Sequence, residues 1–526
     1  MLSTPNGRSH TSPYHPFLPI LLLQLCTLGV LLNDSPSAAL STANTKSYDL
    51  VVIGGGSAGL TAAKFAATFG KTTCIIEEEK LGGDCTWTGC VPSKALLASA
   101  KSAHAVRKSK EFGVSSGEVP VMVDMKKVKE RLIRIQNHIY EADDSPEVMK
   151  KLGVETIEGR ASFASSNTLF VEGTSGSSKI VANEGIVICT GAKAIRPSGN
   201  TIAGLESVKY LTYEEVFELD TLPQRLTVVG GGPIGCELSQ AFSRLGSTVT
   251  QIATKLLSSA EPEVTRAMEQ VFETEGVQRI KSTVASVSPG AGESHVAICS
   301  DGSRVEGDVI LVAVGRAPNV DIKGLKDVGV RLNSRKGIDV DSTLRTAVKR
   351  IYAAGDCTGD AQFTHYAGYQ GAVAARNVLL PLTDPGVLSD VPATTFTSPE
   401  VASVGLSEKE AREKYKKSGT ISVAYKEIKD VDRAECESEY DGFIKIIYKT
   451  KSYEILGATI VSTAAGEMIS EISVAIKAKM KFDTLATVMH SYPSYSFALQ
   501  AMAAELYYDK LLRYKGLLSF LKKLGL

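Results

Sequence analysis

The sequence predicts an α/β chain in which two similar strand–turn–helix units precede a separate C-terminal α+β domain. The stretch Ser47–Lys80 has the pattern strand, glycine turn, helix, strand. The same pattern returns in Arg225–Lys255, roughly 175 residues later. From about Val391 the chain changes to short alternating runs such as SVAYKEI and GFIKIIYK, which are typical of antiparallel strands.

Length and composition are those of a large globular chain. Its 526 residues correspond to about three domains of roughly 150 residues each. Hydrophobic residues make up 43% and charged residues 22%, which is ordinary for a folded protein. Lys and Arg together number 58, as do Asp and Glu, so no basic excess points to nucleic acid as a partner.

The first 45 residues differ from the rest of the chain. Phe17–Leu32 is an uncharged run of sixteen residues, and small residues at Ser37 and Ala39 follow it. This order is typical of a secretory signal peptide, and the run is short for a membrane span, which needs about 20 residues. We therefore predict entry into the secretory pathway. An uncleaved signal anchor is the main alternative, and onward transport to a plastid is another.

The first strand–turn–helix unit has the features of a Rossmann-like dinucleotide site. Gly54, Gly56 and Gly59 fit the spacing G-x-G-x-x-G. A buried strand, Leu50–Ile53, precedes them, and Glu77 ends the strand after the helix. Such glycines allow a tight turn and close approach of the backbone to a pyrophosphate, and the acid accepts a hydrogen bond from a ribose hydroxyl.

The second unit repeats the glycines but lacks the acid. Gly230, Gly232 and Gly235 fit the same spacing, so the sequence predicts a second dinucleotide. The following strand ends on Ala253 where an acid is expected, and Lys255 comes soon after. Without a carboxylate a 2′-phosphate is not repelled and Lys255 could pair with it, which slightly favours NADPH over NADH. A surface lysine without a ligand is the alternative.

One local cysteine pair stands out among nine cysteines. Cys26 lies in the leading segment, and only Cys85 and Cys90, in GGDCTWTGCVPSK, lie close together. A disulfide between them requires a distorted turn, because five residues of regular helix separate the Cα atoms too far. A helix starting near Pro92, together with Lys94, would lower the pKa of Cys90. We favour a redox couple over a zinc site, for which two more ligands are missing, or a static clip.

Together these motifs resemble the flavoprotein disulfide reductases, the class I pyridine nucleotide-disulfide oxidoreductases. The two glycine patterns, GGDCTWTGCVPSK, CTGAKAIRP, AVGRAPN and YAAGDC occur in the order of that family. The stretches TTFTSPEVASVGLSE and DVDRAECESEYDGFIK are most similar to its mercuric-reductase-like and lipoamide-dehydrogenase-like branch. The resemblance covers about Ser47–Leu506. It implies FAD and NAD(P)H as cofactors, a homodimer, and a small-molecule or protein disulfide as substrate.

The resemblance also implies roles for individual residues. FAD would be held by Gly54, Gly56, Gly59, Glu77, Gly191 and Asp356, and NAD(P)H by Gly230, Gly232, Gly235, Lys255 and Gly315. Cys85 would attack the substrate, and Cys90 would form a thiolate beside the flavin. Lys94 would lie near the flavin and pair with Glu237. No metal site is expected.

The implied domain order follows the motifs. We expect a targeting segment (1–45), an FAD-binding domain in two parts (46–195 and 316–388), an NAD(P)-binding domain (196–315), a dimerisation domain (389–508) and a basic amphipathic tail (509–526). We expect the tail to pack on the body as an extra helix, and contact with a membrane surface is the alternative.

The stretch MHSYPSYSFALQ departs from the family pattern. Tyr492 stands before Pro493 where the family has His, and Phe497 stands where it has the Glu that orients that His. Tyr has a pKa near 10 and is a poor proton acceptor at neutral pH. His490 faces the same way as Tyr492 in an extended segment, so both are candidates for the catalytic acid or base. The departure argues against lipoamide and glutathione as substrates. The absence of a cysteine pair from the C-terminal LLSFLKKLGL argues against mercury.

Three functions therefore remain open to the sequence. The favoured one is an NAD(P)H-dependent flavoprotein that reduces a disulfide or another soft electrophile through Cys85 and Cys90. A second is a diaphorase or quinone reductase that uses the flavin directly. A third is a non-catalytic, flavin-binding redox sensor.

Overall fold

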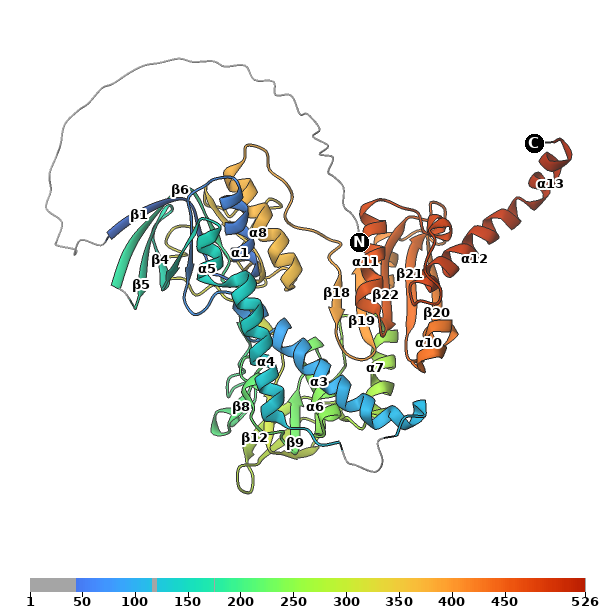
Figure 1. Ribbon diagram of the computed structural model, residues 1–526, viewed down its shortest axis with the longest axis horizontal. Helices are drawn as coiled ribbons and strands as arrows, with labels where there is room; N and C mark the ends of the chain where they lie inside the picture. The colour runs from blue at the N-terminus through green and yellow to red at the C-terminus, as the bar shows by residue number, and fades with distance from the viewer. Residues whose placement is uncertain (1–43, 116–120, 175, 526) are drawn as a thin grey trace, which may run out of the picture. The chain divides into compact units, whose positions relative to one another are not determined.

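A computed structural model describes residues 44–115, 121–174 and 176–525. The predicted signal segment, apart from its last two residues, lies outside these ranges. The described residues form five sheets with their helices (Figure 1). Within these ranges, no helix combines the length and apolar character that crossing a bilayer requires.

The first sheet is built from two separate parts of the chain. Its strands run in the order β3-β2-β1-β6-β5-β4, and β17 pairs with β6. Strands β1, β2, β3, β6 and β17 pair in parallel, whereas β4 and β5 form an antiparallel extension. The bounds are β1 (Asn44–Ile53), β2 (Thr73–Glu77), β3 (Val154–Glu158), β4 (Arg160–Ser165), β5 (Thr168–Gly173), β6 (Gly176–Ile188) and β17 (Ile351–Ala353).

Strand β1 is longer than the sequence indicated. The apolar run predicted only Leu50–Ile53, but the strand begins at Asn44. The polar stretch Asn44–Tyr48 pairs with Ser178–Ala182 of β6, so backbone pairing rather than apolar pattern defines its start. The two residues 44 and 45, assigned to the targeting segment from sequence, therefore belong to the sheet.

Two helices pack closely together on one face of this sheet. They are α1 (Ser57–Thr68) and α8 (Thr364–Leu379), and they lie side by side in Figure 1. A Cβ on Gly371 would lie 2.0 Å from the carbonyl oxygen of Ala58, so only glycine permits this approach. The contact ties the first nucleotide-binding turn to a segment some 300 residues later in the chain.

The second sheet is parallel and has the order β11-β10-β9-β15-β8. Its bounds are β8 (Tyr210–Leu211), β9 (Arg225–Val229), β10 (Thr248–Ile252), β11 (Gln278–Ile280) and β15 (Val309–Val312), with helices α6 (Pro233–Leu245) and α7 (Pro262–Thr274). A small antiparallel sheet of β12 (Val284–Pro289), β13 (His295–Cys299) and β14 (Arg304–Gly307) accompanies it. Strand β7 (Ala192–Ala194) pairs with β16 (Arg316–Pro318), which joins the two nucleotide-binding units.

The C-terminal domain has the antiparallel sheet that the alternating pattern predicts. Its order is β18-β19-β22-β21-β20. The strands are β18 (Ala393–Thr395), β19 (Glu400–Gly405), β20 (Ile421–Glu427), β21 (Phe443–Lys449) and β22 (Ile455–Ser462). Helices α9 (Glu408–Lys414), α10 (Asp432–Glu437), α11 (Ala465–Lys477) and α12 (Phe497–Arg513) complete the domain.

A buried ion cluster joins the second unit to the C-terminal domain. The ammonium group of Lys445, on β21, lies 3.2 Å from Glu261 and 3.3 Å from Glu263 at the start of α7. It also lies 2.8 Å from Glu408 at the start of α9. Burial alone would lower the pKa of Lys445, but its hydrogen bonds and the charges of the carboxylates raise it. The lysine is therefore held as a buried cation.

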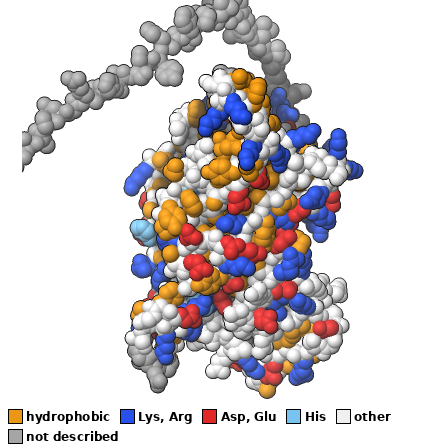
Figure 2. All heavy atoms as spheres, turned by 90° about the vertical axis from the view of Figure 1, so that its right-hand side faces the viewer, with side chains coloured by type: hydrophobic (Ala, Val, Ile, Leu, Met, Phe, Trp, Pro, Cys, Tyr) orange, Lys and Arg blue, Asp and Glu red, His pale blue; other side chains and the backbone are white. Residues whose placement is uncertain are grey.

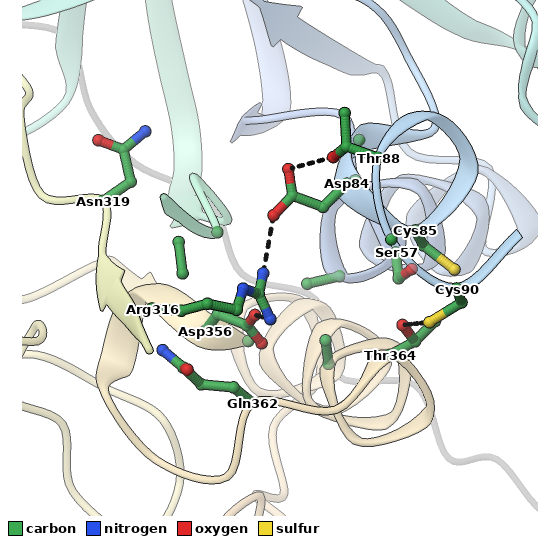
Figure 3. Close-up of a pocket in the computed structure, with 18 of the residues that line it drawn as sticks. Ser57, Asp84, Cys85, Thr88, Cys90, Arg316, Asn319, Asp356, Gln362 and Thr364 are labelled. Atoms are coloured by element: carbon green, nitrogen blue, oxygen red, sulfur yellow. Dashed lines mark hydrogen bonds and ion pairs between the residues drawn. The ribbon is translucent and has the colours of Figure 1, made fainter. Parts of the chain in front are cut away.

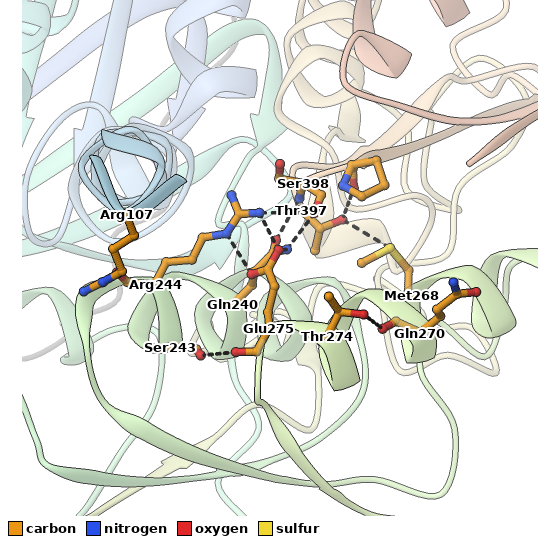
Figure 4. Close-up of polar contacts among 11 residues, drawn as sticks. Arg107, Gln240, Ser243, Arg244, Met268, Gln270, Thr274, Glu275, Thr397 and Ser398 are labelled. Atoms are coloured by element: carbon orange, nitrogen blue, oxygen red, sulfur yellow. Dashed lines mark hydrogen bonds and ion pairs between the residues drawn. The ribbon is translucent and has the colours of Figure 1, made fainter. Parts of the chain in front are cut away.

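A second polar network links the same two domains (Figure 4). The guanidinium of Arg244, on α6, donates to both carboxylate oxygens of Glu275 at 2.8 and 2.5 Å. The side-chain amide of Gln240 and the backbone of Ser398 exchange two hydrogen bonds, each of 2.7 Å. Arg107, from α3 (Cys90–Lys108), donates to the backbone carbonyl of Arg244. Helix α6 thus meets the C-terminal domain at Ser398, and α3 contacts α6 beside this site.

We expected from the sequence that the C-terminal tail would pack on the body of the chain. In the structure it does not. The last buried residue of α12 is Ala503. A further helix, α13 (Lys515–Lys523), follows and has no buried residue (Figure 1). The side chain of Lys510 forms the last ion pair with the domain, 2.8 Å from Asp483.

Candidate active site

A cavity of about 1650 Å³ contains most of the residues that the sequence singled out (Figure 3). Its lining comes from both nucleotide-binding units, the cysteine segment and the start of the C-terminal domain. The predicted residues that line it are Gly54, Gly56, Glu77, Cys85, Cys90, Lys94, Gly191, Glu237, Gly315 and Asp356. The fold therefore brings residues that lie up to about 300 positions apart in the sequence to one cavity.

The first glycine turn has the shape required for a pyrophosphate. Gly54 has a φ of +101°, and a Cβ there would lie 2.3 Å from the carbonyl oxygen of Cys189. A Cβ on Gly59 would lie 1.8 Å from the carbonyl oxygen of Gly54, so this glycine allows α1 to pack on the turn. A Cβ on Gly56 would meet nothing closer than 3.8 Å. The space in front of Gly56 is therefore open to a ligand at the N-terminus of α1.

Glu77 lies next to this turn, at the end of β2. Its carboxylate accepts hydrogen bonds from the backbone N–H of Gly55, at 2.6 Å, and of Glu79, at 2.8 Å. Burial raises the pKa of Glu77, although these hydrogen bonds oppose the rise. A fixed acceptor beside the turn fits the ribose of a dinucleotide.

The second glycine turn has the same geometry. Gly230 has a φ of +127°, and a Cβ on Gly235 would lie 2.4 Å from the Gly230 carbonyl oxygen. A Cβ on Gly232 would meet nothing within 4 Å. The carbonyl oxygen of Lys255 lies 2.3 Å from where a Cβ on Gly231 would be, and the Lys255 side chain is exposed. Lys255 thus lies beside this turn; Pro233 and Ile234 of the turn line the large cavity, whereas its glycines and Lys255 do not.

The two cysteines lie at a break between two helices. Cys85 is in the short helix α2 (Gly83–Trp87), and Cys90 is the first residue of α3. A Cβ on Gly89 would lie 2.8 Å from the carbonyl oxygen of Asp84, so glycine lets the chain double back there. This is the distorted turn that the sequence required. Both sulfurs are thiols in this structure, and they are hydrogen-bonded to one another.

The surroundings of the two sulfurs give them different acidities. The hydrogen bond from Cys85 is the main cause that lowers the pKa of Cys90 to about 6, and it outweighs burial. Thr364 and the charge of Lys94 lower it further. The same hydrogen bond and burial raise the pKa of Cys85. At neutral pH the pair therefore holds one thiolate, on Cys90, and one thiol.

Lys94 and Glu237 form the ion pair that the resemblance implied. The ammonium nitrogen of Lys94 lies 3.0 Å from a carboxylate oxygen of Glu237. The Glu237 side chain is only 7% exposed, and its second oxygen accepts a hydrogen bond of 2.8 Å from the backbone N–H of Phe396. Lys94 also lies 4.4 Å above the centre of the Phe396 ring. The pair therefore connects the cysteine helix, the second unit and the C-terminal domain.

Three residues of the cavity were not predicted. Arg316 bridges two carboxylates, with one nitrogen 2.8 Å from Asp356 and another 2.7 Å from Asp84 (Figure 3). Thr364 lies 3.2 Å from the sulfur of Cys90. Arg316 follows Gly315 directly in the motif AVGRAPN, so the motif contained the signal for it. Asp84 likewise precedes Cys85 directly in GGDCTWTGCVPSK, whereas Thr364 carries no comparable signal, because its contact with Cys90 is made only in the folded chain.

Burial raises the pKa of Asp356, and the Arg316 guanidinium partly opposes this. Asp356 begins the turn after β17 and lies in the cavity lining together with the cysteines. Its carboxylate is positioned to accept a hydrogen bond from a ligand that extends from the first glycine turn towards the sulfur pair.

His490 and Tyr492 do not line this cavity in the single chain. Both ring nitrogens of His490 are engaged, Nε2 at 2.7 Å from Glu471 and Nδ1 at 2.8 Å from the carbonyl oxygen of Val488. Burial alone would lower the pKa of His490, but these two contacts raise it. The Tyr492 hydroxyl donates a hydrogen bond of 2.7 Å to Asp432. The role of catalytic acid or base that we expected for either residue stays a prediction.

The described residues include no group of three or more His, Cys, Asp or Glu side chains arranged to hold a metal ion. The residues that line the cavity fit an FAD molecule. The open space at Gly56 would take its pyrophosphate, Glu77 its ribose, and Asp356 its ribityl chain. Cys90 and Lys94 lie further along the same lining. The fold and site thus define a two-nucleotide redox enzyme with a cysteine pair in its cavity.

Comparisons with known proteins agree with this class of enzyme. Residues 48–371 match the family model described as pyridine nucleotide-disulphide oxidoreductase, and residues 391–503 match the dimerisation domain of the same family. The chain belongs to this family. A mercuric reductase from Lysinibacillus sphaericus is 34% identical over 475 residues, which are 89% of this chain and 84% of the relative. A dihydrolipoyl dehydrogenase from Chlamydia muridarum is 34% identical over 85% of this chain and 94% of its own.

Solved structures show the same fold. The HOCl-induced flavoprotein disulfide reductase RclA from Escherichia coli, solved as a Cu(II) complex, has a TM-score of 0.77 and 25% identity. It is matched over 87% of this chain and 99% of its own. LpdA from Mycobacterium tuberculosis has a TM-score of 0.76 and 28% identity, over 88% of this chain and 99% of its own.

The predicted class, fold and cofactors are therefore confirmed. The protein is an FAD-dependent NAD(P)H disulfide oxidoreductase with a C-terminal dimerisation domain, and it acts as a homodimer.

Proposed function

We propose that the substrate is a disulfide, in a small molecule or a protein, and that Cys85 attacks it. The observation that carries this proposal is the placement of both cysteines in one cavity, with Cys90 at the N-terminus of α3 and 3.2 Å from Thr364, surroundings that lower the pKa of Cys90. When bound, FAD supplies the chemistry that passes electrons from NAD(P)H to the sulfur pair. The residues of the chain determine which sulfur meets the substrate.

The reaction at the sulfurs balances without a further reactant. The Cys85 thiol passes its proton to the Cys90 thiolate as its sulfur attacks one substrate sulfur, and the other substrate sulfur leaves as a thiolate. That leaving thiolate takes the proton from Cys90. The Cys90 thiolate then attacks Cys85, which forms the Cys85–Cys90 disulfide and releases the second substrate thiolate, protonated from water. The pair is oxidised by two electrons and the substrate disulfide is reduced.

An anaerobic titration with NAD(P)H, followed by alkylation and mass spectrometry, tests this proposal. We expect reduction to make Cys85 and Cys90 newly available to alkylation and disulfide reduction to depend on both. Cys85→Ser and Cys90→Ser should each abolish disulfide reduction. Cys436→Ser is the matched control, because Cys436 is exposed but lies outside the cavity lining. Disulfide reduction that survives in Cys85→Ser would contradict the proposal.

A diaphorase or quinone reductase is the second candidate. It is favoured by the state of His490, whose two ring nitrogens already contact Glu471 and the carbonyl oxygen of Val488. Quinone reduction that persists in Cys85→Ser/Cys90→Ser, without disulfide reduction in the parent, would favour the diaphorase.

We also propose that NADPH is preferred over NADH. The support is the position of Lys255, whose backbone lies against Gly231 at the second turn and whose side chain is exposed there. No acid occupies the end of β10 to repel a 2′-phosphate. We expect Lys255→Glu to lower kcat/KM for NADPH about tenfold or more while sparing NADH, since a charge-assisted contact is worth ~1.5–3 kcal/mol. Lys326→Glu, another exposed lysine, is the control.

A third proposal concerns location. We infer that the leading segment directs the chain into the secretory pathway, supported by the run Phe17–Leu32 and the small residues Ser37 and Ala39. N-terminal sequencing of protein from the native cell tests this. A new N-terminus just after Ala39 is expected for a cleaved signal peptide. An intact N-terminus in a membrane fraction would indicate a signal anchor, and an intact N-terminus in soluble protein would refute the proposal.

A further inference from the structure

We propose that the C-terminal tail binds the surface of anionic lipid membranes through helix α13, independently of the redox chemistry. The tail leaves the dimerisation domain after the ion pair between Lys510 and Asp483. Its helix has no buried residue in the chain. The match to the family dimerisation domain ends at residue 503, so α13 lies beyond the matched residues.

The residues of α13 separate into two faces. At about 100° per residue, the apolar side chains fall within one arc of the helix and the lysines within the opposite arc. The apolar face contains Leu517, Leu518, Phe520, Leu521 and Leu524, of which Phe520 is 58% exposed and Leu524 59%. The other face contains Lys515, Ser519, Lys522 and Lys523.

The charge of the tail indicates the kind of partner. After Asp509 the sequence contains no acid, but it contains Lys510, Arg513, Lys515, Lys522 and Lys523. The whole chain is formally neutral, so this is a local concentration of positive charge. The upper part of the surface in Figure 2 shows hydrophobic and basic side chains together. A short basic helix with a continuous apolar face is the kind that lies in the headgroup region of an anionic bilayer.

An apolar face alone would also suit a second protein chain. The three lysines favour lipid, because a protein partner would have to supply matching carboxylates, whereas an anionic membrane offers negative charge at every position. The homodimer carries two copies of α13, and engaging both on one bilayer would strengthen a contact that is weak for a single helix.

Sedimentation of the dimeric, flavin-loaded full-length protein with lipid vesicles tests the proposal. One set of vesicles contains only phosphatidylcholine, and the other also contains phosphatidylserine. We expect binding to the anionic vesicles that falls as salt is added, and much weaker binding to the neutral ones. Equal binding to both would point to the uncharged run Phe17–Leu32 of the leading segment and would overturn the proposal, as would no binding to either.

Two variants of the tail sharpen the test. Lys515→Glu/Lys522→Glu/Lys523→Glu should weaken anionic-vesicle binding by roughly a hundredfold or more, at about fivefold for each basic residue removed. Leu518→Asp/Leu521→Asp should abolish it. The matched control is Lys409→Glu/Lys416→Glu/Lys417→Glu, which makes the same change in net charge at exposed positions of the same domain. An equal loss in the control would overturn the proposal.

The same samples distinguish lipid from protein as the partner. NAD(P)H-dependent flavin bleaching should be unchanged in both tail variants, because α13 is remote from the cavity lining. Gel filtration should show an unchanged dimer. If Leu518→Asp/Leu521→Asp instead dissociates the dimer, the apolar face belongs to the subunit interface and the membrane proposal is wrong.

Discussion

The sulfur of Cys90 lies 3.2 Å from the hydroxyl oxygen of Thr364, although 274 positions separate them in the sequence. Cys90 is the first residue of α3, and Thr364 is the first residue of α8. Two helix N-termini therefore meet at this sulfur, and their dipoles and the hydroxyl favour a thiolate there. The reactive state of Cys90 thus depends on the contact between two distant parts of the chain.

Replacing Thr364 with Val removes the hydroxyl and keeps the size of the side chain. We expect the pKa of Cys90 to rise above its value of about 6 by about one to two units, since a hydrogen bond to a charged group is worth ~1.5–3 kcal/mol. The hydrogen bond from Cys85, which lowers the pKa of Cys90 more than the one from Thr364 does, remains in this variant. The rate of alkylation by iodoacetamide, measured against pH, gives the pKa. Thr364→Ser keeps the hydroxyl and should behave like the parent, and an unshifted Val variant would show that the contact is unimportant.

The pH dependence of cysteine alkylation in the parent enzyme follows from the pKa values of Cys90 and Cys85. Cys90 is deprotonated above a pH of about 6 and protonated below it, so its alkylation in the reduced enzyme should level off above this pH and fall below it. Cys85 has a raised pKa and should be modified more slowly than Cys90 at neutral pH. Cys85→Ala removes the main cause of the low value and should move the midpoint for Cys90 upwards. Peptide mass spectrometry separates the two sites, and preferential labelling of Cys85 would contradict the assignment.

Breaking the pair between Lys94 and Glu237 should cost stability. Lys94→Met leaves the Glu237 carboxylate buried with only the Phe396 N–H as partner. We expect a loss of ~1–3 kcal/mol in the free energy of unfolding, less than for a fully buried pair because Lys94 is 36% exposed. Urea denaturation measures it.

Two further variants test the cause of that loss. Adding Glu237→Gln to Lys94→Met should recover part of the stability, because the stranded charge is then removed. Lys101→Met, at an exposed position on the same helix, should change little. If Lys101→Met costs as much as Lys94→Met, the loss comes from the helix and not from the pair.

The glycines of the two turns should differ in their response to alanine. At Gly59 a methyl group would collide with the carbonyl oxygen of Gly54, so Gly59→Ala should destabilise the fold by ~1–3 kcal/mol. At Gly56 and Gly232 a methyl group finds open space. We expect Gly56→Ala to fold but lose FAD, and Gly232→Ala to keep FAD but bind NAD(P)H at least tenfold more weakly, because each methyl occupies the place of a pyrophosphate.

Thermal denaturation, flavin absorbance and NAD(P)H titration separate these three outcomes. Gly56→Ala and Gly232→Ala serve as controls for one another, since each should affect one nucleotide only. Full FAD content in Gly56→Ala would mean that the first turn does not hold the pyrophosphate.

Local patterns in the sequence were sufficient to predict much of the fold and site. The glycine spacings predicted both nucleotide turns, because the required backbone shapes permit few other residues at Gly54, Gly59 and Gly235. Alternating apolar residues predicted the C-terminal sheet. Within the cavity, the sequence was sufficient to predict Cys85, Cys90 and Lys94. These residues lie close together in one motif, GGDCTWTGCVPSK, whose composition and spacing indicate redox chemistry.

What the sequence did not reveal depends on long-range contacts. Thr364 is an ordinary threonine until α8 packs on α1 and brings it to Cys90. Strand β1 begins early because its polar first residues pair with β6, which no apolar pattern signals. The tail helix α13 was expected to pack on the body because it is amphipathic, but an apolar stripe does not identify the surface that covers it.

The buried cluster around Lys445 restricts how the enzyme can move. Glu261 and Glu263 come from the nucleotide unit, whereas Glu408 and Lys445 come from the dimerisation domain. Separating the two would break the contacts of Lys445 with Glu261 and Glu263 and leave Glu408 as its only carboxylate partner in this cluster, which is unfavourable. We therefore expect the second unit and the dimerisation domain to move together as one body, so that a nucleotide enters the cavity without the two domains separating.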